Sequence, residues 1–349
     1  MSFLHQDERK KRNLRDPVNI AVIGAGYWGR KVTSEYLALA KDEPGTNLAR
    51  VCDVQEQNLR HCSEVLEIPK ERLVSSYKDL LDLDDVNAVH ICTPNETHYQ
   101  ICREALMAGK HVLLEKPMTL SFRQALELMD LAEKEELVLQ VGYIFRFNNA
   151  LKKVQELIKD GFFGDLYYLR LQWTTLMQPT PNRDIIFDLG PHPFDIMNFL
   201  LGTWPLKVVC KAGAYTREAP LEMACATAEF DGKLMANVEL SWLHPKRERS
   251  VCVIGSENSA TVDCLNQNVE IFENHGKSGH RIDVQRNNTI LDELRHFIGH
   301  VRGVGELVNG GPVGPMNVLV LESLKKSLRE DRTVKIVPSH LEPTQLRLK

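Results

Sequence analysis

The chain has 349 residues, which is more than one hydrophobic core of typical size requires, so its length predicts two domains. Apolar residues make up 43% of the sequence, charged residues 26%, and the formal net charge is −4. This balance is ordinary for a globular protein and favours neither a nucleic-acid partner nor a membrane partner. No apolar run approaches the ~18 residues that a membrane-spanning helix needs.

The first 17 residues, "MSFLHQDERKKRNLRDP", lack the apolar centre of a signal peptide. Their basic run, residues 9–12, is interpreted as part of a solvated tail rather than a nucleic-acid arm, because Asp7 and Glu8 lie beside it. The eight cysteines are scattered, with no CxxC pair and no Cys/His cluster. We therefore expect reduced thiols in a cytoplasmic protein and no metal site.

From Val18 onwards, apolar strand-like runs alternate with segments of helical spacing. Such alternation predicts crossover connections and a parallel sheet that is buried on both faces. We assign residues 18–142 to this first domain. The predicted strands are 18–26, 48–54, 86–94, 111–117 and 137–143, and the predicted helices are 27–41, 55–66, 96–110 and 121–136.

After about Tyr143 the pattern changes to a series of strand-like runs, several of which meet at turn signals such as Asp231-Gly232. Runs joined by short turns predict an antiparallel sheet. We assign residues 143–349 to this second α/β domain. It begins with a predicted helix at 149–160, continues with strands at 165–176, 206–216, 223–231, 234–243, 249–256, 259–265 and 269–274, and closes with a helix at 316–331.

The first predicted strand ends in a G-x-G-x-x-G pattern made by Gly24, Gly26 and Gly29. The first glycine permits a tight turn, the second lets the backbone approach a pyrophosphate, and the third lets helix pack on strand. The following helix offers free N–H groups and a positive dipole end to phosphates. The motif therefore predicts a dinucleotide site, with Tyr27 and Trp28 among its contacts.

Asp53 ends the second predicted strand, 24 positions after Gly29, close to the ~20 expected for an acid that binds the adenosine ribose. Its carboxylate would repel a 2′-phosphate, and no lysine or arginine occurs from Val51 to Leu59. NAD is therefore favoured over NADP. The alternative is that Asp53 is only the N-cap of a helix.

The triplet Glu115-Lys116-Pro117 follows the fourth predicted strand. Ligands of open parallel sheets bind beyond the carboxyl ends of strands. The proline restricts the conformation of the residue before it, so the Lys116 ammonium is directed into the cleft, where it could stabilise a developing alkoxide. The alternative is a surface lysine that pairs with Glu115.

A second constellation is Asp188-Leu-Gly-Pro-His192. We expect Asp188 to cap a helix, and a helical turn would bring Asp188 and His192 to one face. His192, with an ordinary pKa near ~6.5, suits general-base chemistry at neutral pH. The alternative is a capped helix with a buried histidine.

The segment "YIFRFNNA" places Arg146 and Asn148 at the junction between the domains. Arg146 could receive a phosphate or a carboxylate of the substrate, or it could form a salt bridge between packed domains. The same question applies to Arg183, just before the Asp188 motif. We include all three among the predicted substrate contacts.

The glycine motif, "CTPNETHYQICREALMAGKHVLLEKPMTL" and "FDLGPHPFDIMNFLLG" resemble, in order, the Gfo/Idh/MocA oxidoreductases, which include glucose–fructose oxidoreductase and inositol dehydrogenase. The resemblance runs from about Val18 to Ile336. It implies a Rossmann domain, then an α/β domain with an open, mainly antiparallel sheet that binds substrate and commonly forms oligomers. It also implies cofactor contacts by Thr93, Pro94, Asn95, His98, Glu115 and Lys116, with His192 as base and Asp188 as its helper.

The resemblance implies an NAD-dependent enzyme that transfers a hydride between a sugar hydroxyl carbon and nicotinamide. The phrase "DLGPHPFDIMNFLLG" is most similar to members that act on UDP-linked aminosugars, such as UDP-N-acetylglucosamine 3-dehydrogenases. The alternatives are a dehydrogenase of free polyols, inositol or aldoses, and a regulator that senses NAD without turning it over. A small-molecule substrate and a homo-oligomer, dimer or tetramer, complete the expectation.

Overall fold

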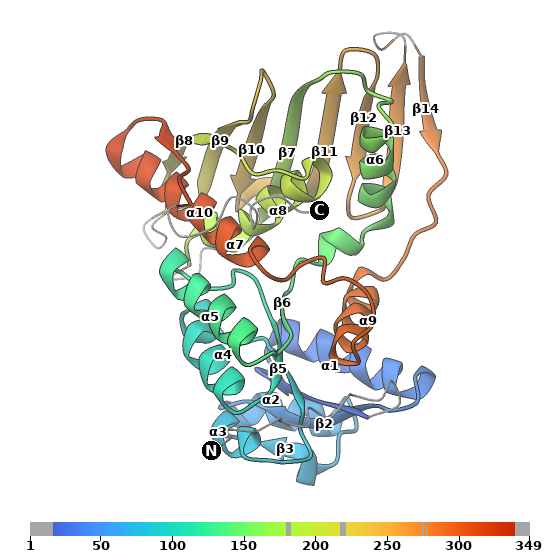
Figure 1. Cartoon of the computed structure of the whole chain (residues 1–349), viewed down its shortest axis with the longest axis vertical. Helices are drawn as coiled ribbons and strands as arrows, with labels where there is room; N and C mark the ends of the chain where they lie inside the picture. The colour runs from blue at the N-terminus through green and yellow to red at the C-terminus, as the bar shows by residue number, and fades with distance from the viewer. Residues whose placement is uncertain (1–16, 179–182, 217–220, 274–275, 277, 339–349) are drawn as a thin grey trace, which may run out of the picture.

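The structure is a computed structural model that describes residues 17–178, 183–216, 221–273, 276 and 278–338. All of the predicted N-terminal tail except Pro17 lies outside the described residues. Two sheets lie one above the other, joined through β6 and flanked by helices (Figure 1). Within the described residues, every helix is too short or too polar to cross a bilayer. All eight cysteines are free thiols.

The first sheet is a Rossmann sheet of six parallel strands in the order β3-β2-β1-β4-β5-β6. The prediction of a parallel Rossmann sheet is confirmed. The strands are β1 (Val18–Ile23), β2 (Thr46–Cys52), β3 (Leu73–Val74), β4 (Ala88–Ile91), β5 (His111–Leu114) and β6 (Leu139–Val141). The helices are α1 (Tyr27–Asp42), α2 (Glu56–Glu64), α3 (Tyr77–Leu81), α4 (His98–Met107) and α5 (Phe122–Lys134), with 3₁₀ turns η1 (Lys70–Arg72), η2 (Asn95–Thr97) and η3 (Ile144–Phe147). Sequence patterns missed β3 and α3, because elements of 2 and 5 residues are too short to show a period.

The second sheet has nine strands in the order β14-β13-β12-β11-β7-β10-β9-β8-β15, and of these neighbours only β7 and β10 run parallel. The prediction of a large, mainly antiparallel sheet is confirmed. The strands are β7 (Leu166–Leu176), β8 (Lys207–Gly213), β9 (Met223–Glu229), β10 (Met235–Ser241), β11 (Leu243–Gly255), β12 (Ser259–Asp263), β13 (Asn268–Glu273), β14 (Ser278–Ile282) and β15 (Val334–Lys335). The helices are α6 (Asn149–Lys159), α7 (Ile185–Leu189), α8 (Pro191–Leu201), α9 (Thr289–Val301) and α10 (Val313–Glu330).

One face of the second sheet is covered by α6, α7, α8 and α10 (Figure 1). Along β7, Leu169, Leu171 and Trp173 are fully buried, while Arg170 between them is exposed. This alternation is that of a sheet with one packed face. The residues that share the parity of Trp173 therefore point towards the helices and the first domain.

Helix α9 returns the chain to the first domain, where it packs beside α1 (Figure 1). Leu294 and Phe297 of α9 belong to the same buried cluster as Val32 and Tyr36 of α1. Asn288 caps the helix by accepting a hydrogen bond from the Leu291 N–H. The predicted domain division at residue 143 stays a prediction, but a helix from beyond it completes the first core.

The two domains share a buried core that fixes the loop after β5 against α10. Met118, in that loop, lies in one cluster with Val141 and Met316. A side chain at Gly314 would overlap Met118, so the backbone of α10 approaches the loop directly. Asn317 of α10 donates to the Pro191 carbonyl at 2.9 Å and so holds the start of α8. The loop after β5 and the beginning of α8 are thus held against the same helix.

Candidate active site

The glycine turn after β1 has the shape that a phosphate-binding turn requires. Gly24 has φ +96°, and a Cβ there would lie 2.7 Å from the Cys92 carbonyl oxygen. A Cβ at Gly29 would overlap the Gly24 carbonyl oxygen, whereas at Gly26 it would meet nothing within 4 Å. Gly26 is also the N-cap of α1 and supplies no side-chain cap, so the first turn keeps N–H groups for an anion. The open side of Gly26 fits the approach of a pyrophosphate.

Asp53 fastens this turn to the neighbouring strand. Its carboxylate accepts from the Ala25 N–H at 2.6 Å, from the Gln55 N–H at 2.7 Å and from Asn58 Nδ2 at 3.1 Å. The bond to Gln55, at the beginning of α2, supports the alternative that Asp53 orders a helix start. The bond to Ala25 also places the carboxylate beside the glycine turn. Its role towards a ribose stays a prediction.

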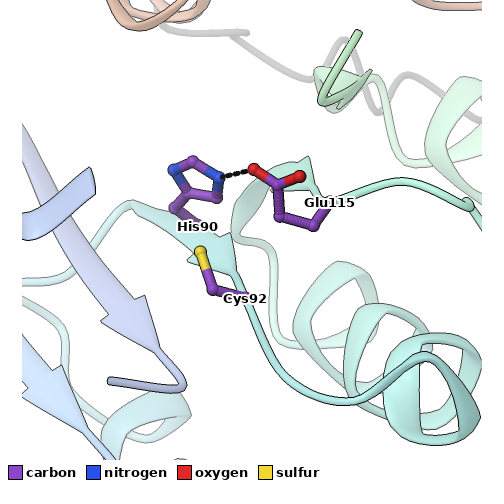
Figure 2. Close-up of side chains that lie close together, drawn as sticks. All are labelled: His90, Cys92 and Glu115. Atoms are coloured by element: carbon purple, nitrogen blue, oxygen red, sulfur yellow. Dashed lines mark hydrogen bonds and ion pairs between the residues drawn. The ribbon is translucent and has the colours of Figure 1, made fainter. Parts of the chain in front are cut away.

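Glu115 is held inside the protein by a small polar cluster (Figure 2). Its Oε1 atom accepts from Trp28 Nε1 and lies 3.3 Å from His90 Nε2, and His90 Nδ1 lies 3.3 Å from the Tyr36 hydroxyl. Cys92 Sγ, a ring nitrogen of His90 and a carboxylate oxygen of Glu115 all lie within 4.8 Å of one another. Because two donors already engage Glu115 Oε1, this cluster supports the loop after β5. Glu115 and Trp28, which were both predicted to contact the cofactor, are hydrogen-bonded to each other.

His98 ties the loop after β4 to the segment that carries Lys116. It is fully buried, with Nδ1 2.8 Å from the Pro117 carbonyl oxygen and Nε2 2.9 Å from the Thr93 carbonyl oxygen. The Lys116–Pro117 peptide bond is cis. The prediction that His98 touches the cofactor is therefore wrong, because burial leaves its ring no surface for a ligand. Thr93, Pro94 and Asn95 stay predicted cofactor contacts, and Tyr27 is 71% exposed beside the glycine turn.

Lys116 reaches across the domain junction to Asp188. Its Nζ donates to the Asp188 carbonyl at 2.8 Å and lies 3.8 Å from the carboxylate Oδ1. The Lys116 side chain is 21% exposed, so it is not turned into bulk water, and its partner is not Glu115. Arg183 Nη1 lies 3.9 Å from the other carboxylate oxygen of Asp188. The structure therefore brings Lys116 to two residues, Arg183 and Asp188, that lie much later in the sequence.

The turn between α7 and α8 places Asp188 and His192 together. Asp184 caps α7 by accepting from the Ile186 N–H at 2.8 Å. Gly190 is the N-cap of α8, the helix that Asp188 was predicted to cap, so that prediction is wrong. Asp188 instead lies within α7. Gly190 continues the right-handed conformation into α8, and a side chain there would overlap the Ile186 carbonyl oxygen. Pro191 takes the first helical position of α8, where its missing N–H costs nothing.

His192 is half-buried against aromatic rings, with its ring centroid 5.0 Å from that of Phe145 and 6.5 Å from that of Trp173. Its Nδ1 atom is enclosed and has no hydrogen-bond partner among the described residues. Burial, and then the positive charges of Lys116 and Arg249, lower the pKa of His192 well below its ordinary value. The imidazole is therefore neutral at neutral pH and able to accept a proton.

Arg249 of β11 is a charged residue of this site that the sequence patterns did not single out. It pairs with Trp173 across the sheet and shares its face of β11 with the buried Val251 and Val253. The signal was present in the sequence, because an arginine at the inward parity of an apolar strand is unusual.

Arg146 and Asn148 are structural residues, which corrects their assignment as substrate contacts. Arg146 is 3% exposed and donates to Asp195 at 2.8 Å, to Asn198 at 2.6 Å and to the Val308 carbonyl at 2.7 Å. Asn148 is 1% exposed and caps α6. Their polar atoms serve packing between segments, as in the salt-bridge alternative for Arg146.

We predict that replacing Arg146 with methionine lowers the free energy of unfolding by about 3 to 5 kcal/mol, because Asp195 would be left buried without its cation. Urea denaturation measures this loss. Arg281→Met on the exposed strand β14 is the control and should change stability by less than about 0.5 kcal/mol. Equal stability of the two variants would contradict a packing role for Arg146.

Comparisons with known proteins agree with this geometry. Residues 18–143 match a family profile described as "Oxidoreductase family, NAD-binding Rossmann fold", and residues 151–261 match one described as "GFO/IDH/MocA C-terminal domain". The chain is 28% identical to the UDP-N-acetylglucosamine 3-dehydrogenase of Acidithiobacillus ferrooxidans over 290 residues, which cover 80% of this chain and 87% of that protein. It is 26% identical to the myo-inositol 2-dehydrogenase of Thermotoga maritima over 345 residues, which cover 91% and 98%.

The solved structure of UDP-N-acetylglucosamine 3-dehydrogenase GnnA from Acidithiobacillus ferrooxidans superposes with a TM-score of 0.78 at 26% identity. The superposition covers 90% of this chain and 98% of that one, so both domains correspond. The two family profiles together extend over most of the chain, in the order that the sequence motifs predicted. The chain belongs to the Gfo/Idh/MocA family of oxidoreductases, and its first domain is an NAD-binding Rossmann domain.

Proposed function

We propose that the protein is an NAD-dependent dehydrogenase that oxidises a hydroxyl-bearing carbon of a sugar. The observation that carries this proposal is the contact of Lys116 Nζ with the Asp188 carbonyl at 2.8 Å, which brings the ammonium to the turn that leads from α7 to His192 in α8. A cation, a carboxylate and a neutral base thus meet beyond the carboxyl ends of β4 and β5. A bound nicotinamide would supply the hydride acceptor.

His192 is the proposed base. In the oxidation direction, the substrate O–H bond breaks as the imidazole takes the proton, while the carbon gives up its hydride and becomes a carbonyl carbon. The low pKa of His192 keeps the ring unprotonated before the reaction. Phe145 and Trp173 fix the ring by edge and tilted contacts, so the base is held in place before substrate arrives.

Lys116 and Asp188 are the proposed partners of the reacting oxygen. The Lys116 ammonium donates one N–H to the Asp188 carbonyl and has two further N–H groups to donate. A donated hydrogen bond would stabilise the negative charge that grows on the substrate oxygen as its proton leaves. The Asp188 carboxylate, 3.8 Å from Nζ, keeps the ammonium in place and can accept from a second sugar hydroxyl.

Gly26 provides a test of the cofactor site that is separate from the chemistry. We predict that Gly26→Ala folds normally, since its φ of −66° suits any residue and a Cβ there meets nothing within 4 Å. The same Cβ would occupy the side open to a pyrophosphate, so the Kd for NAD should rise by about tenfold, which equals the loss of one hydrogen bond to a charged group. Fluorescence titration with NAD and thermal unfolding measure both effects.

Gly299→Ala in α9 is the matched control for Gly26→Ala, because its Cβ also has room. It should leave NAD binding unchanged and raise the free energy of unfolding by about 0.5 to 1 kcal/mol, because alanine replaces glycine inside a helix. Unchanged NAD affinity in Gly26→Ala would show that the cofactor phosphates lie elsewhere.

For the substrate, we propose a nucleotide sugar of the UDP-N-acetylglucosamine type, on the support of the relative whose name states that substrate. The similarity to a myo-inositol 2-dehydrogenase supports a free polyol as the second candidate substrate. Initial rates of NADH formation with UDP-linked sugars, free aldoses and inositol decide between them. Absence of NADH formation with every one of these compounds would refute the enzymatic proposal and leave a regulator that senses NAD.

A homo-oligomer, dimer or tetramer, also stays part of the proposal. The residues of β7 and β9 that point away from the helices include the exposed Arg170 and Cys225, so this face of the sheet is accessible at those positions. Light scattering on the purified protein measures the assembly.

A further inference from the structure

Arg249 is held in a defined orientation in the site. Its Nη1 atom donates to the carbonyl oxygens of Thr174 and Glu248, at 2.8 Å each. Its guanidinium carbon lies 5.7 Å from the centre of the Trp173 ring, on which His192 also packs. Two hydrogen bonds and an aromatic face therefore fix the plane of the guanidinium, whereas an arginine in solvent would move freely.

The charge of Arg249 has no counter-ion in contact with it among the described residues. Those residues include no carboxylate within 4 Å of its nitrogen atoms and no hydrogen-bond partner for Nε or Nη2. Asp188 is the carboxylate whose charge acts on Arg249, and Asp188 is already shared by Lys116 and Arg183. Burial, the largest effect, lowers the pKa of Arg249 to about 10, so the side chain is still a cation at neutral pH.

The site therefore holds an excess of positive charge. Lys116, Arg183 and Arg249 are arranged around the single carboxylate of Asp188 in the part of the chain that the structure describes. Partly buried charges without a partner are costly, and a ligand of opposite charge removes that cost. Planar guanidinium groups with free N–H donors bind the oxygen pairs of phosphates and carboxylates.

We propose that Arg249 is the anion-binding residue of the substrate pocket, and that it takes a phosphate or carboxylate oxygen of an acidic sugar. This deepens and rests on the proposed function, since it selects acidic sugars over neutral polyols. The sequence suggested Arg146 for this role, but Arg146 is buried and hydrogen-bonded to Asp195. Arg249, in contrast, lies close enough to His192 for its charge to act on the base. A phosphate and a carboxylate share the required chemistry, so the experiment includes both.

The kinetic test uses pairs of one neutral and one acidic sugar: N-acetylglucosamine with UDP-N-acetylglucosamine, glucose with glucose 1-phosphate, and galactose with galacturonate. The native enzyme should prefer an acidic member in kcat/KM. Arg249→Gln should lose that preference by about 10- to 150-fold, the range for a hydrogen bond to a charged group, without a matching loss on the neutral member. Arg170→Gln, exposed on the face of β7 that points away from the helices, should behave as the native enzyme.

The loss of kcat/KM on each pair decides whether the acidic group that Arg249 binds is a phosphate or a carboxylate. Loss confined to the phosphate pairs identifies a phosphate, and loss confined to galacturonate identifies a carboxylate. Equal losses on acidic and neutral members would overturn the proposal, because they indicate a structural role on Trp173. A native enzyme that shows no preference for any acidic member would overturn it as well.

A binding measurement keeps this inference separate from the proposed function. NADH-saturated protein is titrated calorimetrically with uridine diphosphate and with galacturonate, so the pyrophosphate turn is occupied and the sugar cannot be oxidised during the titration. At least one of the two should bind to the native protein and to Arg170→Gln, but about 10-fold or more weakly to Arg249→Gln. If no sugar is oxidised and this pattern still holds, the enzymatic proposal fails and the anion site stands. If Arg249→Gln binds both probes as the native protein does, the anion site is refuted.

Discussion

Replacing His192 with glutamine is expected to lower kcat by about 10²- to 10⁴-fold, the usual contribution of a positioned general base. Glutamine keeps a polar group of similar size against Phe145 and Trp173 but cannot take a proton at neutral pH. NAD affinity should change little, since the ring lies on α8 of the second domain and the glycine turn lies on the first. Stopped-flow measurement of NADH formation with the best substrate of the panel gives kcat.

The control for this variant is His280→Gln, on the exposed strand β14. It should have native kinetics. Kinetics of His192→Gln within a factor of two or so of native would remove His192 as base. A fall in NAD affinity as large as the fall in kcat would instead indicate that the variant disturbs the junction between the domains.

The first domain was predictable because its strands are buried on both faces and its turns carry glycines in fixed places. The burial of every residue of β4 and β5 fits their mostly apolar sequences, in which His90 and His111 are the exceptions. Helix α9 was missed although Leu291, Leu294, Phe297, Ile298 and Val301 follow a helical period after the N-cap Asn288. Because α9 follows the second sheet in the sequence, its packing in the hydrophobic core of the first domain could not be inferred from its position.

In the site, spacing predicted the residues that lie at element ends and failed for those whose roles depend on burial. Lys116, Asp188 and His192 follow strand or helix boundaries that the sequence displays, and they meet as expected. From the amino-acid sequence alone, His98 and Arg146 resemble residues that contact a ligand. Only the fold shows that carbonyl oxygens surround the first and that Asp195 and Asn198 engage the second.

The same reasoning explains why Arg249 was overlooked. Its strand reads as a mixture of charged and apolar residues at its beginning, and β11 pairs irregularly with β7 between Leu243 and Glu248. Parity along a strand is unreliable across such an irregularity. Arg249 lies just beyond the irregularity, so its shared parity with the buried Val251 and Val253 was the one sequence signal of its inward direction.

Replacing Lys116 with glutamine is expected to lower kcat by about 10²- to 10³-fold, as the loss of one donor to a developing oxyanion does. A second effect follows from the electrostatics. Lys116 is one of two cations that lower the pKa of His192, after burial as the larger cause. Without it that pKa rises, so His192 becomes protonated at a higher pH, and the acid limb of kcat/KM should move to higher pH.

Lys116→Arg keeps the positive charge and should leave the acid limb near its native position, even if the longer side chain lowers the rate. The other groups that face His192 stay constant in both variants: Arg249 from β11 and Asp188 from α7 are charged, whereas Phe145 and Trp173 are not. A glutamine variant whose acid limb stays in place, or moves to lower pH, would show that the ammonium does not act on the base. Native turnover in that variant would place the oxyanion donor elsewhere, so the rate and the pH profile test the two roles of Lys116 independently.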